Sequence, residues 1–113
     1  MLPGKAPFKL AAVCCFLATL GAAESLAADA AAGRQKARAC AACHGIDGIA
    51  KMPIAPHIAG ESQVYLETQL KAFRSGKREN EIMSVVTTDL SDEDISDLAA
   101  WYSSIQFSVT LPE

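Results

Sequence analysis

Five consecutive residues, Cys40-Ala41-Ala42-Cys43-His44, carry the clearest chemical signal in the sequence. Two thiols three positions apart lie on one helical turn, where each can add across one vinyl group of a porphyrin. The histidine that follows the second thiol is then placed to bind the porphyrin iron. The spacing C-x-x-C-H therefore predicts one covalently attached haem c, with His44 as the first axial ligand.

Two other uses of a cysteine pair fit the sequence less well. A thioredoxin-like redox pair lies where a strand meets a helix in a βαβ fold, and the chain has no such pattern. A zinc site needs four ligands, and adjacent Cys43 and His44 would be awkward on one tetrahedral ion. We therefore favour a haem over a dithiol or a zinc ion.

The second axial ligand decides the function, and the candidates are Met52, His57 and Met83. Met83 is far along the chain and can approach the iron from the face opposite His44, whereas Met52 and His57 are expected to stay on the side of His44. A thioether ligand favours ferrous iron and raises the reduction potential. We favour Met83; the alternatives are that each methionine fills the core and that His57 is an exposed loop residue.

The first 27 residues have the pattern of a secretory signal peptide. A basic start precedes an apolar run over residues 10–20, which is too short to span a bilayer as a helix. Residues 25–27 fit the small-x-small rule for cleavage, and residues 21–23 are a second candidate. We expect residues 1–27 to be removed and residues 28–113 to work in the periplasm without stable membrane insertion. A retained membrane anchor is the alternative.

The remaining segment, residues 28–113, would be one small domain. A chain of this size builds only a modest hydrophobic core and usually needs a staple, a metal or a cofactor. Cys14 and Cys15 lie in the apolar N-terminal run and should leave with it, so Cys40 and Cys43 are the only cysteines left. A buried haem would supply the missing apolar volume.

Charge excludes one class of partner. Residues 28–113 carry eight Lys and Arg against twelve Asp and Glu, a net charge of −4. Nucleic-acid-binding proteins present a basic face, so we expect no nucleic acid partner and instead expect protein partners met through local charge patches. The acidic residues at 92–97 are expected to form a solvated face, and the basic residues at 71–78 to form a docking surface beside the haem edge.

The hydrophobic pattern predicts an all-α domain of three to four helices and no convincing strand. An Ala-rich helix over residues 29–42 runs into the haem motif, and Gly33 would let another helix approach closely. Gly and Pro residues predict a loop over residues 45–60. A second helix is expected to begin after Ser62 as N-cap and to end at Gly76.

Two further elements complete the domain. A short helix or turn is expected around Met83, because the β-branched residues 85–88 have no partner strand. A final helix begins at the acidic start that follows Ser91 and fades near Gln106. The last helix carries Trp101 and its neighbour Tyr102, which are expected to pack at a helix crossing rather than to relay electrons.

Several segments resemble class I c-type cytochromes of bacteria, in particular one half of the periplasmic dihaem cytochromes of the c-four type and the cytochrome subunit of flavocytochrome c sulfide dehydrogenase. The chain departs from the dihaem relatives in having a single C-x-x-C-H. It also lacks the second methionine that often follows the axial one. The matching segments are Cys40–Gly45, Pro56–Gly60, Tyr65–Leu66, Gln69–Leu70, Phe73–Gly76, Leu90–Ile95 and Leu98–Tyr102.

This resemblance implies a small cytochrome c fold around one haem, with His44 and Met83 as axial ligands. It also implies that the Pro56 carbonyl accepts from the His44 ring, and that the N-terminal helix near Gly33 crosses the last helix near Trp101 and Tyr102. The implied function is one-electron transfer without catalysis, with a dehydrogenase, a membrane cytochrome complex, or a terminal oxidase or reductase as partner. The alternatives are an electron-accepting haem subunit of a flavoprotein or other dehydrogenase complex and a gas-binding haem protein.

Overall fold

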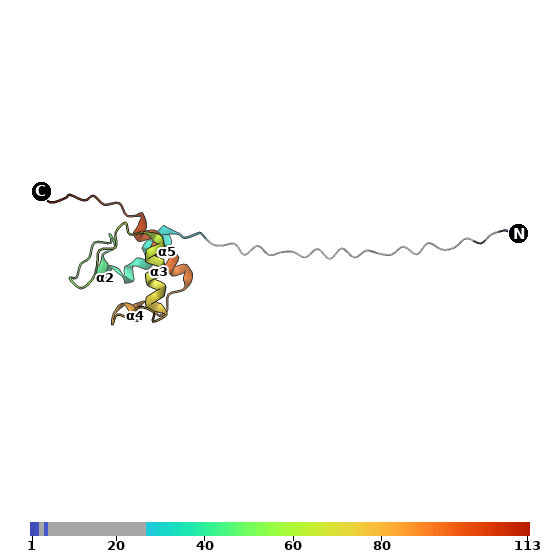
Figure 1. Ribbon diagram of the computed structural model, residues 1–113, viewed down its shortest axis with the longest axis horizontal. Helices are drawn as coiled ribbons and strands as arrows, with labels where there is room; N and C mark the ends of the chain where they lie inside the picture. Colours follow the sequence, from blue (N-terminus) through green and yellow to red (C-terminus); the bar gives the residue numbers. More distant parts are fainter. Residues whose placement is uncertain (3, 5–26) are drawn as a thin grey trace.

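The computed structural model describes residues 1, 2, 4 and 27–113, and these contain helices and no strand (Figure 1). Nearly all of the predicted signal peptide lies outside the described residues. Within the described part, no helix is long and apolar enough to cross a membrane. The predicted all-α fold is confirmed. The elements are α1 (Ala30–Lys36), the 3₁₀ turn η1 (Ala37–Ala39), α2 (Ala41–His44), α3 (Gln63–Arg74), α4 (Met83–Val86) and α5 (Asp92–Ser104).

The predicted helix over residues 29–42 is broken into three pieces, so the prediction of one continuous helix was wrong. Asp29 caps α1 as its carboxylate accepts from two backbone N–H groups. The helix then tightens into η1, where the Cys40 N–H bonds the Ala37 carbonyl at 2.9 Å. Ala37 is fully buried in the main apolar cluster. No Pro, Gly or capping residue marks the break, so packing rather than local sequence determines it.

Gly33 is the point where α1 crosses α5. A Cβ at this position would lie 1.9 Å from the Asp97 carbonyl oxygen and 3.0 Å from the Trp101 Cβ. Only a glycine allows the two backbones to come so close. The crossing expected near Gly33 is therefore present, and it lies between Asp97 and Trp101 of α5.

An ion-pair network lies beside this crossing. The Lys36 ammonium binds the Asp97 carboxylate at 2.7 Å and the Asp94 carboxylate at 2.9 Å. The Asp29 N–H also donates to Asp97 at 2.8 Å. Asp97 is only 3% exposed, so the prediction of a solvated acidic face was wrong for this residue. Its carboxylate joins the start of α1 to the middle of α5.

The remaining core joins α3 to α5. Leu66 on α3 packs in one cluster with Leu98, Ala99 and Tyr102 of α5. Ser62 caps α3 by accepting from the Tyr65 N–H, as expected from the sequence. The start of α5 carries the predicted capping box, in which Ser91 and Asp94 bind each other's backbone N–H groups.

The two arginines of the basic group at 71–78 bond other segments of the chain. Arg74 donates to the Leu90 carbonyl at 2.7 Å and pairs with Asp92. Arg78 donates to the Gln69 side chain at 2.6 Å, and its guanidinium lies 4.5 Å from the centroid of the Phe73 ring. Arg78 joins the segment before α4 to α3, and Arg74 joins α3 to the segment after α4.

We expect Gly33→Ala to destabilise the fold by about 1–3 kcal/mol, because the added methyl group overpacks the crossing. Helix propensity alone would give the opposite sign, a gain of about 1 kcal/mol. Guanidinium unfolding of the holoprotein measures the difference, and a stabilised variant would contradict the close approach.

The ion-pair network predicts an acid-labile fold. The Lys36 ammonium, followed by the Ser91 groups, lowers the pKa of Asp94 to about 2. Lys36 and then the Asp29 N–H also lower the pKa of Asp97. Because both pKa values lie below the ordinary 3.8, the network stabilises the fold above that pH and is lost as the pH falls towards 2.

Lys36→Met should therefore cost about 1–3 kcal/mol at neutral pH and flatten the loss of stability in acid. Lys51→Met is the matched control, because the Lys51–Asp47 pair is half-exposed on both sides and an exposed ion pair contributes little to stability. Unfolding free energies measured from pH 7 to pH 3 test both. Equal profiles for the two variants would exclude the network as the cause.

Candidate haem site

The attachment turn is compact and carries two free thiols. The His44 N–H bonds the Cys40 carbonyl at 3.0 Å, so residues 40–44 form a single helical turn. Cys40 and Cys43 are partly buried and form no disulfide. Burial, followed by the neighbouring Cys43, raises the pKa of the Cys40 thiol. The turn therefore presents two thiols, as attachment to two vinyl groups requires.

One ring nitrogen of His44 forms a hydrogen bond within the protein, and the other forms none with the described residues. Its side chain is buried, and Nδ1 lies 2.9 Å from the Pro56 carbonyl oxygen. A carbonyl only accepts, so Nδ1 carries the proton and donates. The lone pair then lies on Nε2, which is the arrangement found in histidines that bind metals.

The loop over residues 45–60 brings Pro56 back to His44. The Gly48 carbonyl accepts from the Ile58 and Ala59 N–H groups at 2.8 and 3.1 Å. The Lys51 N–H donates to the Cys43 carbonyl at 2.8 Å, which closes the loop onto the attachment turn.

Trp101 and Tyr102 hold the start of this loop from α5. The Trp101 Nε1–H donates to the Ile46 carbonyl, and the Tyr102 hydroxyl donates to the Gly45 carbonyl, both at 3.0 Å. Burial raises the pKa of Tyr102, so the phenol keeps its proton and remains a donor. The sequence predicts a packing role for both residues; their polar contacts with the loop have no sequence signal.

Two of the three candidate axial ligands lie within the loop that follows His44. The Met52 sulfur is 3.5 Å from the Cys43 sulfur, beside the attachment turn. His57 is exposed, and its Nδ1 accepts from the Ala50 N–H at 2.9 Å. This nitrogen is therefore occupied by a hydrogen bond within the loop.

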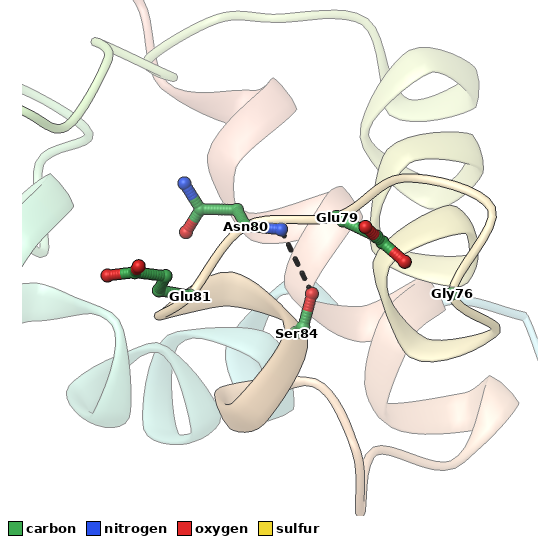
Figure 2. Close-up of a pocket in the computed structure, with 5 residues that line it drawn as sticks. All are labelled: Gly76, Glu79, Asn80, Glu81 and Ser84. Carbon is green, nitrogen blue, oxygen red and sulfur yellow. Dashed lines mark hydrogen bonds between the residues drawn. The ribbon is translucent and has the colours of Figure 1, made fainter.

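Met83 comes from a different part of the fold. It is the first residue of α4, which packs against α3, and it is partly buried. In Figure 1, α4 lies near the C-terminal end of α3. An open hollow of about 540 Å³ lies against the segment that leads into α4, and Figure 2 shows the residues that line it: Gly76, Glu79, Asn80, Glu81 and Ser84.

These residues fit a haem c. The attachment turn offers two free thiols, the His44 ring offers one nitrogen, and the part of the chain that the structure describes contains no cluster of three or more His, Cys, Asp and Glu for a bare metal ion. Large apolar side chains are exposed on the loop after the motif and on or beside α4. Apolar side chains on these two segments suit contact with a porphyrin, which is itself largely apolar. These side chains are Ile49, Met52, Ile54, Ile82, Val85 and Val86.

Comparison with known proteins decides the family. The family described as Cytochrome c matches residues 30–106. The chain belongs to the cytochrome c family. It is therefore an electron-transfer protein with covalent haem c rather than a catalytic enzyme, and Cys40, Cys43 and His44 fit the attachment motif.

Three relatives show how the chain compares in length. It is 49% identical over 81 residues to cytochrome c-554(548) of Halomonas halodenitrificans, covering 69% of this chain and 98% of that protein. It is 40% identical over 93 residues to the thiosulfate dehydrogenase electron acceptor of Thiomonas intermedia, covering 80% of this chain and 42% of the relative. The crystal structure of reduced recombinant cytochrome c4 from Pseudomonas stutzeri superimposes with a TM-score of 0.68 and 38% identity, covering 74% of this chain and 48% of cytochrome c4. The chain spans less than half of the latter two proteins.

Tyr102→Phe should destabilise the holoprotein by about 1 kcal/mol or more, because the buried Gly45 carbonyl loses its donor. Tyr65→Phe is the matched control, since Tyr65 is 47% exposed on α3. Guanidinium unfolding measures both variants. If they behave alike, the bond to Gly45 contributes nothing to the fold.

Proposed function

We propose that this cytochrome is a periplasmic one-electron carrier whose single haem iron is bound by His44 and Met83. The observation that carries the proposal is the hydrogen bond between His44 Nδ1 and the Pro56 carbonyl. It fixes the imidazole plane and leaves Nε2 for the iron. The position of Met83 supports its role as the second ligand, because it lies on α4, outside the loop that contains Met52 and His57.

Bound haem supplies a one-electron couple between ferric and ferrous iron. The chain's own part is to keep the same two ligands in both oxidation states, so that little rearranges when an electron moves. The buried ring of His44 and the Pro56 carbonyl act on one side. On the other side the thioether of Met83 favours the ferrous state and raises the potential.

The periplasmic location rests on the sequence of the first 27 residues. A basic start, a short apolar run and a small-x-small site are typical of cleaved export signals. We propose that residues 1–27 are removed and that residues 28–113 form the working cytochrome.

A dehydrogenase is the partner class that the comparisons favour. The chain is similar to a protein named as the electron acceptor of thiosulfate dehydrogenase. We propose that the cytochrome accepts electrons from a dehydrogenase, either as a free carrier or as a bound subunit, and passes them to a membrane cytochrome complex or a terminal oxidase or reductase. Gel filtration of native extract separates the two forms: elution as a lone small protein would exclude the bound subunit.

Met83→Ala should lower the reduction potential by on the order of 0.1 V, within the range of about 0.8 V that axial ligands set. It should also let carbon monoxide bind the reduced iron, which the parent protein should resist. The sulfur-to-iron absorption band of the oxidised protein should disappear. Visible spectra and a redox titration measure these changes.

Met52→Ala is the matched control, because it removes the other thioether near the attachment turn. It should leave the band, the potential and the resistance to carbon monoxide close to those of the parent. If Met52→Ala loses the band and Met83→Ala keeps it, the axial assignment is wrong. If the parent itself binds carbon monoxide, the gas-binding alternative replaces the carrier.

A further inference from the structure

Met83 lies on an element too short to be stable alone. The helix α4 has four residues, and its N-cap residue Ile82 makes no side-chain hydrogen bond to cap it. Isolated helices of this length do not persist in water, because their few hydrogen bonds do not repay the ordering of the backbone. The position of Met83 must therefore depend on side chains that hold this turn.

Asn80 holds the N-terminal side of Met83. One oxygen, Asn80 Oδ1, accepts from the Met83 N–H at 2.9 Å and from the Ile82 N–H at 3.0 Å. Asn80 is itself bound twice to Ser84: its N–H donates to the Ser84 hydroxyl at 3.1 Å, and its carbonyl accepts from the Ser84 N–H at 2.9 Å. Figure 2 shows the first of these bonds as a dashed line. The two bonds between the Asn80 backbone and Ser84 therefore hold the Asn80 side chain in place at the start of α4.

Thr87 holds the C-terminal side. The Met83 carbonyl accepts from the Thr87 hydroxyl at 2.8 Å and from the Thr87 N–H at 3.1 Å. Thr87 is fully buried, with 0% of its surface exposed. A buried hydroxyl that loses its partner is costly, so this bond is stronger than its exposed equivalents. Both the N–H and the carbonyl of Met83 therefore bond a side chain that lies within four residues of it.

We propose that Asn80 and Thr87 are positioning residues that clamp the backbone of Met83 and so keep its thioether on the iron. The proposal rests on the axial role of Met83 proposed above. The clamp matters most in the oxidised protein, because ferric iron is a harder acid than ferrous iron and holds a soft thioether less firmly. Because Asn80 and Thr87 order the segment around Met83 when the protein folds, binding of the thioether to iron costs less conformational entropy.

The test removes each bond while keeping side-chain size. Asn80→Leu removes the acceptor, and Thr87→Val removes the hydroxyl from a buried position. Asn80→Asp and Thr87→Ser restore an acceptor and a hydroxyl. Thr68→Val is the matched control outside the loop, since the Thr68 hydroxyl bonds the Val64 carbonyl at 2.7 Å in α3 by the same i to i−4 pattern.

The measurement is an imidazole titration of the oxidised holoprotein. Displacement of Met83 is monitored as the loss of the sulfur-to-iron absorption band. Asn80→Leu and Thr87→Val should each lower the imidazole concentration at half-displacement about five- to tenfold, as expected when a side chain that bonds the backbone of the turn is lost. Asn80→Asp, Thr87→Ser and Thr68→Val should titrate like the parent. Guanidinium unfolding, run in parallel, detects any general loss of stability.

The outcomes separate the two proposals. If Asn80→Leu and Thr87→Val both titrate like the parent while Met83→Ala has lost the band, the clamp is wrong and the axial ligand stands. If Met83→Ala keeps the band, the axial assignment fails and the clamp fails with it. If Asn80→Leu does not fold, Thr87→Val and its Thr87→Ser rescue still decide the question.

Discussion

The close crossing of α1 and α5 at Gly33 is the constraint on which the haem site depends. The attachment turn follows α1 directly, and α5 carries the aromatic residues that bond the loop after the turn. If the two helices were farther apart, Trp101 and Tyr102 would not reach the Ile46 and Gly45 carbonyls. The missing side chain at one glycine therefore sets the distance between the thiols and the donors that support them.

The two sides of the site are held by different means. On the side of His44, an irregular loop is fixed by many backbone hydrogen bonds and by two aromatic donors from α5. On the side of Met83, one short turn depends on a few polar side chains and on arginines that anchor its flanks. The first arrangement is spread over many contacts, and the second is concentrated in few.

The sequence predicted the parts of the fold that local chemistry controls. The caps at Ser62 and Ser91 and the glycine at the end of α3 are visible in residue types, because each acts on its own backbone neighbourhood. The break between α1 and α2 and the burial of Asp97 were missed, because both arise from contacts between segments about 60 residues apart. The C-x-x-C-H motif was readable for the same local reason, and the bond from His44 to the Pro56 carbonyl was expected from the resemblance. The bonds from Trp101 and Tyr102 to the loop were not predicted.

The bonds of Trp101 and Tyr102 also affect the order in which the site forms, because they connect distant parts of the sequence. They join positions 55 and 57 residues apart in sequence, and closing such long loops comes late in folding. Until α5 is in place, the loop that follows the attachment turn lacks the two donors that hold its start. The two thiols and the loop that supports His44 are therefore brought into their final arrangement only when α5 packs against α1.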